Sequence, residues 1–357
     1  MLKRSCRNMN RWANRLLIGG ACSSVVLATA VYSPLQSQTK DTGQIEKSSL
    51  LKNEGLISRK IIGEMDRTGL NLKLYQYQTC PFCCKVRAAL DYYGFSYEVI
   101  EVNPITRKQL KFSKDYKKVP IVVANGEVVI TESSLIVSVL STLLREKKCS
   151  LQDILARFPA VSTVDEKTQK PVIHYPNKYY IMANPDSRLS TRDVQYLREE
   201  REWRQWVDDH FVHLISPNVY RTWKESFDTF RWFSEVGEWE QAFPMWERYI
   251  AIYLGAVAMH IISKRLKKRH EIVDERQSLL DACNKWMDAL GSNRPFMGGP
   301  QPNLADLALY GCMNSFVGCD AFKEVCEKSS ICEWYGRMRT QVESRAGSSE
   351  LNGVQSQ

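Results

Sequence analysis

The tetrapeptide Cys80-Pro81-Phe82-Cys83 lies at the junction of two sequence patterns. Before it, residues 72–77 alternate apolar and polar side chains, as a half-buried strand does. After it, residues 85–90 have the composition and spacing of a helix. A strand that ends in this motif and passes directly into a helix places the first sulfur at the helix N-terminus. Free backbone N–H groups and the helix dipole favour a thiolate there, so the pattern predicts a reactive Cys80.

Length and charge narrow the class of protein. The 357 residues are enough for two folded domains and a tail. The net charge of +9 is unevenly distributed, because residues 1–40 hold six Lys and Arg and no Asp or Glu, which leaves +3 for the remainder. A folded part so close to charge balance argues against nucleic acid as a partner.

The eleven cysteines show no compact pairing pattern. Their odd number and wide spacing predict reduced thiols in an intracellular protein. Neither Cys312 with Cys319 nor Cys326 with Cys332 has the short spacing of a structural zinc site, so we expect no metal. Cys84 directly follows the motif, and we expect it to be a packed thiol without a catalytic role.

The N-terminus holds a candidate membrane or targeting segment. Five cations within residues 3–15 precede the mostly apolar, uncharged run 16–32. This run is at the short limit for a membrane helix, and an Arg-rich, acid-free start also fits a mitochondrial presequence. Residues 1–66 are therefore predicted to contain a membrane anchor or a targeting segment and, over 33–66, a polar tether.

Residues 67–148 predict a small α/β domain. Strands are expected at 71–77, 95–102, 119–123 and 127–130, and helices at 82–93, 104–115 and 132–144. The first strand-helix-strand order predicts parallel pairing. Asn125-Gly126 predicts a tight hairpin between the last two strands.

In the second half of the chain, a helical period in the sequence predicts an all-α domain over residues 192–345. A proline-containing insertion at 149–191 connects the domains, and a short strand or hairpin is expected at 175–182. Helices are expected at 194–214 and 243–270. Residues 346–357 are expected to be a disordered tail.

Two features of this domain allow more specific predictions. The apolar stretch 250–262 is too short to cross a bilayer and predicts a buried core helix. The cations in 264–270 then predict a solvated helix end, with a lipid or phosphate patch as the alternative. Asn303 followed by Asp306 predicts a capping box, which gives Asp306 a structural role.

The first domain resembles the thioredoxin fold in its glutaredoxin and glutathione-transferase form. The resemblance rests on the CxxC motif, on Val119-Pro120 entering the third strand and on Glu132-Ser133 at the next helix start. It implies a cis proline, with the backbone of Val119 and Pro120 binding the cysteine part of glutathione. It also implies that Glu132 and Ser133 receive the γ-glutamyl end, where a helix N-terminus offers N–H donors.

Longer strings are similar to the membrane-associated prostaglandin E synthase type 2 family. They include LYQYQTCPFC, KVPIVVA, VHLISPNVYRT, IISKRLKKRH and RPFMGGPQPNLADLALYG. The resemblance implies an isomerase that converts a lipid endoperoxide, prostaglandin H, to prostaglandin E through Cys80. Tyr77 would hydrogen-bond at the reacting thiol, and Cys83 is the third candidate catalytic residue.

The same resemblance implies cofactors, assembly and location. Glutathione and haem would bind together in a pocket lined by His210 and His213, for which core positions are the alternative. The protein would be a homodimer on the Golgi or mitochondrial membrane, held by one N-terminal anchor, from which the catalytic part can be released to the cytoplasm. Two other functions stay open: a membrane-tethered glutaredoxin-like thiol transferase that uses Cys80 and Cys83, and a haem- and glutathione-binding protein.

Overall fold

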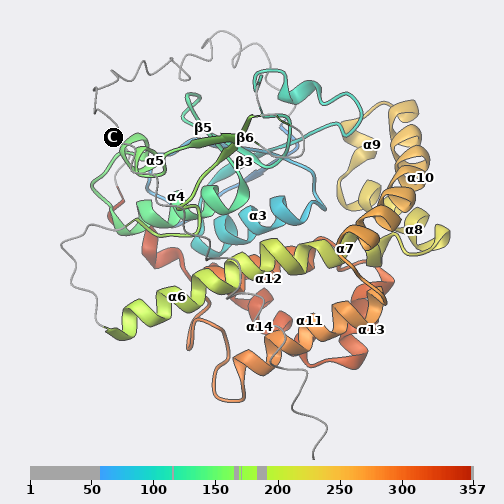
Figure 1. Ribbon diagram of the computed structural model, residues 1–357. Coiled ribbons are helices and arrows are strands. Elements are labelled where there is room, and N and C mark those ends of the chain that lie inside the picture. Colours follow the sequence, from blue (N-terminus) through green and yellow to red (C-terminus); the bar gives the residue numbers. More distant parts are fainter. Residues whose placement is uncertain (1–56, 115, 165–168, 170, 183–190, 355–357) are drawn as a thin grey trace, which may run out of the picture. The chain divides into compact units, whose positions relative to one another are not determined.

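A five-stranded mixed sheet in the order β1-β3-β2-β4-β5 carries the CxxC motif (Figure 1). The computed structural model describes residues 57–354 except 115, 165–168, 170 and 183–190. β2 and β3 are parallel, as predicted, and the other neighbouring strands of this sheet are antiparallel. The strands are β1 Arg59–Ile61, β2 Leu72–Gln76, β3 Tyr97–Glu101, β4 Ile121–Ala124 and β5 Val128–Thr131.

Successive side chains of each strand point to opposite faces of the sheet, and both faces are apolar. Helices α3 (Pro81–Tyr93) and α4 (Ser133–Arg145) pack on the face that carries Leu74 and Val122. Tyr75 and Ile121 point to the opposite face, where Phe112 covers them. The fold class is therefore as predicted, a thioredoxin-like α/β unit followed by a helical region.

The turn between β4 and β5 confirms the predicted hairpin. Asn125 and Gly126 both have positive φ, 54° and 73°. Two consecutive residues of this kind are what a type I′ turn requires, and its twist matches that of the flanking strands.

The helix predicted over 104–115 is wrong. The described part of this segment forms turns and only a short 3-10 helix, η1 (Lys108–Leu110). The Asn103 side chain accepts hydrogen bonds from the N–H groups of Ile105 and Thr106, each 2.9 Å, and so competes with helical bonding. Arg107 then adopts a left-handed conformation with φ 47°, which interrupts the helix.

Both ends of the α/β unit extend further than the sequence indicated. β1 lies inside the segment predicted to be a tether, and it pairs with β3 from Arg59 to Ile61. The expected tail is wrong over 346–354, where η3 (Ser348–Leu351) packs against α3 and α4. Leu351 and Val354 are buried, because they cover apolar surface at the C-terminal end of α3.

The connecting insertion contains a hairpin at a different place from the one predicted. Helix α5 (Leu151–Ala156) comes first, and β6 (Val161–Val164) then pairs with β7 (Pro171–His174). Residues 175–182 instead form turns, so the prediction of a strand there is wrong.

The helical region begins with one long irregular helix. α6 (Thr191–Trp206) continues through a π-helical turn, η2 (Val207–Phe211), into α7 (Val212–Val219), close to the helix predicted over 194–214. The remaining helices are α8 Trp223–Val236, α9 Trp239–Ala242, α10 Met245–Arg269, α11 Glu275–Leu290, α12 Leu304–Asn314, α13 Asp320–Lys328 and α14 Ile331–Glu343.

Helix α12 makes the closest contact between the helical region and the α/β unit. A Cβ atom added at Gly311 would lie 2.5 Å from Cα of Lys85 and 2.8 Å from the carbonyl carbon of Cys84. Only glycine therefore allows α12 to approach the backbone of α3 so closely. The described residues fall in a single compact unit of the chain.

The start of α12 confirms the predicted capping box. The Asn303 side chain accepts from the N–H of Asp306, and Asp306 in turn accepts from the N–H of Asn303. Asp306 is fully buried and also accepts from Met297, Gly298 and the Trp334 indole. These bonds give the carboxylate a structural role.

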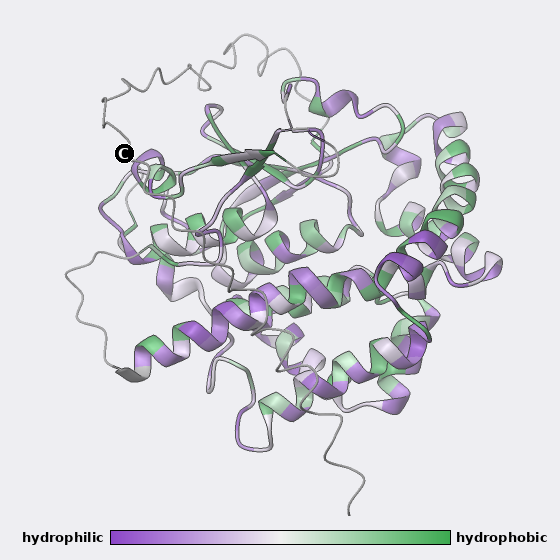
Figure 2. Cartoon of the chain, viewed as in Figure 1, coloured by the Kyte–Doolittle hydropathy of each residue, from purple (hydrophilic) through white to green (hydrophobic). Residues whose placement is uncertain are grey.

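Helix α10 lies within two residues of the predicted bounds, 243–270, but not in the predicted environment. A buried core helix was expected, yet only five of its residues are buried, and apolar side chains such as Trp246 and Leu254 are 60% and 63% exposed. Packing on α8 and α7 uses only one side of the helix, so the opposite side faces outward. In Figure 2 apolar residues extend along most of α10.

One disulfide contradicts the expectation that all cysteines are reduced. Cys326 at the end of α13 and Cys332 at the start of α14 are bonded, with Cα atoms 5.2 Å apart. The turn between these helices brings the two residues together, although six positions separate them in sequence. The other described cysteines are free thiols.

The N-terminal anchor or targeting segment lies outside the described residues. Among the described helices, only α10 has the length and hydropathy needed to cross a membrane.

Candidate active site

Cys80 lies at the N-cap position of α3. Pro81 is the first residue of the helix, where its missing N–H costs nothing. The Cys80 carbonyl accepts from the N–H of Cys84 at 2.9 Å, so the first helical turn closes directly on the motif. The Cys80 side chain is partly exposed, whereas Cys83, one turn along, is buried. The predicted strand-to-helix junction is therefore confirmed.

The two cysteines of the motif differ in acidity. A hydrogen bond from the Cys83 thiol lowers the pKa of Cys80, and the backbone N–H groups of Cys83 and Phe82 act in the same direction, against the effect of burial. Burial raises the pKa of Cys83 well above its ordinary value, and the neighbouring Cys80 adds to this rise. Of the two thiols, Cys80 is therefore the more readily ionised, and Cys83 keeps its proton beside it.

Cys84 is a packed thiol, as expected. Burial raises its pKa to about 11, and its sulfur lies 3.4 Å from the carbonyl oxygen of Gln78 and 3.1 Å from an Arg87 nitrogen. Arg87 also donates to the Gln78 carbonyl at 2.6 Å. Cys84 therefore contributes to the underside of the motif and not to the open side.

Tyr77 lies on the same side of the sheet as Cys80. Both pack, with Tyr116, against the cluster that contains Val119 and Tyr75. Burial raises the pKa of the Tyr77 hydroxyl, and the nearby Arg107 guanidinium opposes that rise. The hydroxyl therefore keeps its proton at neutral pH and can donate a hydrogen bond.

The peptide bond between Val119 and Pro120 is cis, as the resemblance implied. Both residues are buried at the entry to β4. Val119 belongs to the cluster against which Cys80 packs, so the cis peptide and the reactive sulfur share one surface.

Glu132 and Ser133 form the start of α4. Glu132 has φ 66°, an unusual conformation for a residue with a side chain, and occupies the N-cap position without capping the helix through its carboxylate. That carboxylate is partly exposed, 3.9 Å from the Lys178 ammonium and 3.4 Å from the Tyr116 hydroxyl. The start of α4 thus combines a helix N-terminus that no side chain caps with a partly exposed acidic side chain.

A buried charged cluster joins the three helices that meet beside the motif. Lys85 of α3 forms an ion pair with Asp208 of the π-helical turn η2. Ser134 of α4 donates to Asp208 at 2.6 Å, and Tyr179 donates at 3.0 Å. Burial alone would raise the pKa of Asp208, but Lys85 and these hydrogen bonds hold it below its ordinary value.

A second buried network lies under the loop between Tyr77 and Cys80. Glu101 of β3 accepts from the backbone N–H of Gln78 at 2.7 Å and from the Gln76 amide at 3.1 Å. Burial raises the pKa of Glu101 to about 7, although these hydrogen bonds act to lower it. Arg87 donates to the Gln76 side chain as well, so the loop that carries Cys80 is held from below.

His210 and His213 make contacts away from the motif. His210 lies beside Trp206, with ring centroids 5.6 Å apart, and partial desolvation together with Lys285 of α11 lowers its pKa. His213 stacks on His270 at the end of α10, with centroids 4.1 Å apart. The two histidines share a side of the helix, as their spacing indicated, but their ring contacts in the described structure are with helical-region residues.

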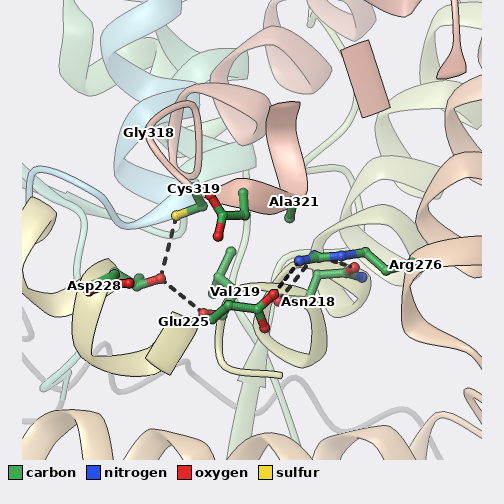
Figure 3. A pocket seen from close by; sticks show the side chains of 10 residues that line it. Asn218, Val219, Glu225, Asp228, Arg276, Gly318, Cys319 and Ala321 are labelled. Atoms are coloured by element: carbon green, nitrogen blue, oxygen red, sulfur yellow. Dashed lines mark hydrogen bonds and ion pairs between the residues drawn. The ribbon is translucent and has the colours of Figure 1, made fainter. Parts of the chain in front are cut away.

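Two cavities of the described structure lie away from Cys80. The smaller, about 30 Å³, lies in the helical region, where Arg276 bonds Glu225 and Asn218 (Figure 3). The larger, about 430 Å³, is lined by Tyr93 and Glu200 at the other end of α3, roughly 18 Å along the helix from Cys80 at 1.5 Å per residue. The first has room for only a water molecule or two.

The sequence did not single out several residues that complete this site. Contacts between distant parts of the chain position these residues. Arg107 lies near Tyr77, and the buried cluster next to α3 contains Lys85, Ser134, Asp208 and Tyr179. No local pattern marks such residues, although an Asp at 208, close to Trp203 and Trp206 in a predicted helix, is a weak signal for a buried charge.

The fold and this geometry define a glutathione S-transferase-like protein. A thioredoxin-like sheet presents a cysteine at the first helix start, a cis proline beside it and a helix N-terminus without a side-chain cap at α4, and an all-α region follows. The sequence model of the glutathione S-transferase N-terminal domain matches residues 74–148.

Two similar proteins identify the family. Prostaglandin E synthase 2 of Danio rerio is 45% identical over 276 residues, which are 76% of this chain and 71% of that protein. Prostaglandin E synthase 2 of Mus musculus is 44% identical over 279 residues, 77% and 71% of the two chains. The chain belongs to the prostaglandin E synthase 2 family.

The solved structures to which this chain is similar have lower sequence identity than these two relatives. A β-etherase from Sphingobium sp. has 19% identity and a TM-score of 0.43, covering 78% of this chain and 98% of its own. Human glutathione S-transferase T1-1 has 14% identity and a TM-score of 0.42, covering 79% and 90%.

Proposed function

We propose that this protein is an isomerase that converts the endoperoxide of prostaglandin H to prostaglandin E, with Cys80 as the nucleophile. The observation that carries the proposal is the Cys80 thiol at the start of α3, whose pKa is lowered by the hydrogen bond from Cys83. Membership of the prostaglandin E synthase 2 family supplies the substrate class.

The first step opens the peroxide. The Cys80 thiolate attacks the peroxide oxygen attached to C9, so an S–O bond forms while the weak O–O bond breaks. The electron pair of the broken bond stays on the oxygen attached to C11, which takes up a proton and becomes the 11-hydroxyl. Tyr77 and Cys83 both keep their protons, because burial raises their pKa values, and they supply hydrogen bonds at the reacting atoms.

The second step releases the product. The hydrogen on C9 leaves as a proton, the C–H electrons form the 9-keto group, and the S–O bond breaks to return the Cys80 thiolate. One proton is gained at C11 and one is lost at C9, and cysteine ends in its starting state. The reaction therefore needs no external oxidant or reductant.

The residues at the start of α4 and at the cis proline fit glutathione. The backbone of Val119 and Pro120 would pair with its cysteine part, and the first N–H groups of α4 with Ser133 would hold its γ-glutamyl carboxylate. The Glu132 carboxylate suits the glutamyl ammonium. Bound there, glutathione would supply a second thiol beside Cys80.

The family resemblance extends the proposal to haem, a homodimer and a membrane anchor. Haem bound with glutathione beside His210 and His213 would give a Soret band that appears only when glutathione is present. An N-terminal anchor within residues 1–66 would hold the protein on the Golgi or mitochondrial membrane. Analytical ultracentrifugation tests the dimer, and microscopy of the chain with and without residues 1–56, a deletion that keeps β1, tests the anchor.

Product analysis from prostaglandin H tests the main proposal. Cys80→Ser is expected to lose prostaglandin E formation, whereas Cys83→Ser keeps part of it, because a hydroxyl can still donate to the Cys80 sulfur. If Cys80→Ser retained full activity, the thiolate mechanism would be wrong. Disulfide reduction that needs both cysteines, with no isomerase activity in the unaltered protein, would instead assign the thiol transferase.

A further inference from the structure

An apolar stripe runs along the outward side of α10. Every strongly exposed side chain from Met245 to Ile262 is uncharged, because Glu247 is buried and Arg248 is held beside Glu240. From Met245 to Leu254 the exposed positions recur every three or four residues, and the exposed Ala258 connects them to Ile261 and Ile262. The stripe consists of Met245, Trp246, Tyr249, Ile250, Tyr253, Leu254, Ile261 and Ile262.

Contacts on the opposite side fix which face of α10 is exposed. Ser226 of α8 donates to the Ala256 carbonyl at 2.7 Å, and a Cβ added at Gly255 would lie 2.5 Å from the Phe230 ring. Near the N-terminus of α10, the buried Glu247 carboxylate accepts a hydrogen bond from Asn103 of the α/β unit. The helix cannot rotate its stripe inward without breaking these contacts.

The stripe is followed by an exposed basic turn. Arg265, Lys268 and Arg269 are exposed, and none of them has an ion-pair partner among the described residues. Lys267 is different, because Glu275 neutralises it. An apolar face with tryptophan and tyrosine, followed by free cations, is the pattern of a helix that lies in the headgroup region of a bilayer.

We propose that this face of α10 binds the surface of an anionic lipid bilayer. The apolar stripe enters the boundary between headgroups and acyl chains, and the three cations contact anionic headgroups. The helix lies on the bilayer and does not cross it, because its other side carries buried polar contacts that a spanning helix would lose. Binding of this face to lipid requires neither the isomerase reaction nor the N-terminal segment.

A second copy of the chain is the rival occupant. Aromatic and aliphatic side chains would suit a dimer interface equally well, since burial of apolar surface drives both. The free cations decide in favour of lipid, because anionic headgroups complement them. Each cation near an anionic bilayer strengthens binding by about fivefold.

Oxidative footprinting of the full chain tests the proposal residue by residue. Hydroxyl radicals are applied with and without vesicles, made of phosphatidylcholine alone or with about 30% phosphatidylserine, and mass spectrometry measures oxidation of Trp246, Tyr249 and Tyr253. Anionic vesicles are expected to reduce oxidation at all three several-fold, and neutral vesicles much less. Tyr180, an exposed aromatic outside the stripe, is the internal reference.

Charge-removing variants separate this surface from other membrane contacts. Arg265→Gln, Lys268→Gln and Arg269→Gln together are expected to raise the anionic lipid concentration needed for protection by a factor on the order of 100. The matched control replaces three exposed cations of α13 and α14 with glutamine, Lys323, Lys328 and Arg339, and should leave the lipid requirement nearly unchanged.

Three outcomes would overturn the proposal. Vesicle binding without protection of the stripe would place the membrane contact elsewhere in the chain. Protection that appears without lipid and grows with protein concentration would assign the stripe to a second copy. Equal protection by neutral and anionic vesicles, unaffected by the triple variant, would remove the role of the cations.

Discussion

Gly311→Ala is expected to force α12 away from α3. The added Cβ would lie 2.5 Å from Cα of Lys85 and 2.7 Å from its nitrogen, whereas carbon atoms in favourable contact are about 3.5–4.0 Å apart. The neighbour is backbone, which cannot yield by changing a rotamer. The two helices must therefore separate by roughly 1 Å, and the overpacking costs about 1–3 kcal/mol.

A second glycine in a helix provides the matched control. Gly336 of α14 has nothing within 4 Å of an added Cβ and is exposed, so alanine there should stabilise the protein by about 1 kcal/mol through helix propensity alone. The same propensity gain applies at position 311. The difference between the two variants therefore isolates the steric term.

Urea unfolding measures this difference, and the pH dependence of Cys80 alkylation measures its consequence at the site. We expect Gly311→Ala to be about 1–3 kcal/mol less stable than Gly336→Ala. Lys85 and Cys84 directly follow the motif, so Gly311→Ala should also change the pKa of Cys80. Gly336→Ala should leave that pKa unaltered. Equal stability of the two variants would refute the close packing of α12 on α3.

The remaining predictions concern buried charges and the motif. Asp208→Asn leaves the Lys85 ammonium buried without a counter-charge and should cost about 3–5 kcal/mol in urea unfolding, whereas Glu202→Gln at an exposed pair should change little; equal effects would contradict the buried pair. Glu101 has a folded pKa of about 7 against an ordinary 4.5, so the folded state binds the extra proton and stability falls as pH rises between these values. Glu101→Gln should remove about 2.5 kcal/mol of the fall in stability measured between pH 5 and pH 8, and an unchanged pH profile would count against this linkage. Cys83→Ala should shift the pH midpoint of Cys80 alkylation upward more than Cys83→Ser, and equal midpoints would show that Cys83 donates nothing to Cys80.

The parts of the fold that follow local rules could be predicted from the sequence. Alternation located β2 and β3, Asn125-Gly126 located the hairpin, and Asn303 with Asp306 located the start of α12. Each of these signals is contained within a few residues, because strand period, turn conformation and helix capping act over short distances.

The failures occurred where a contact between distant residues, or a single side chain, overrides the local pattern. The helix predicted over 104–115 is prevented by the Asn103 side chain and by the conformation of Arg107. The pairing of Lys85 with Asp208 joins residues 123 positions apart, so no local pattern indicates it. The burial of α10 was wrong because apolar composition was taken to mean a position inside the core.

The candidate site divides in the same way. Cys80, Cys83, Tyr77, Val119 and Pro120 could be placed beside one another from the motif and the fold it implies. The histidines were assigned from family resemblance and helix spacing, and spacing cannot show which neighbours a helix face meets.

The packing of η3 on α3 means that the chain returns to the α/β unit after completing the helical region. Gly347 donates to the Tyr92 carbonyl at 3.0 Å, and Leu351 fills apolar space that α3 and α4 leave open. In topological terms the helical region is inserted between two segments that both belong to the α/β unit. Residues 57–148 produced alone would therefore lose the cover that Leu351 and Val354 give to their core, in addition to the packing of α12 on α3.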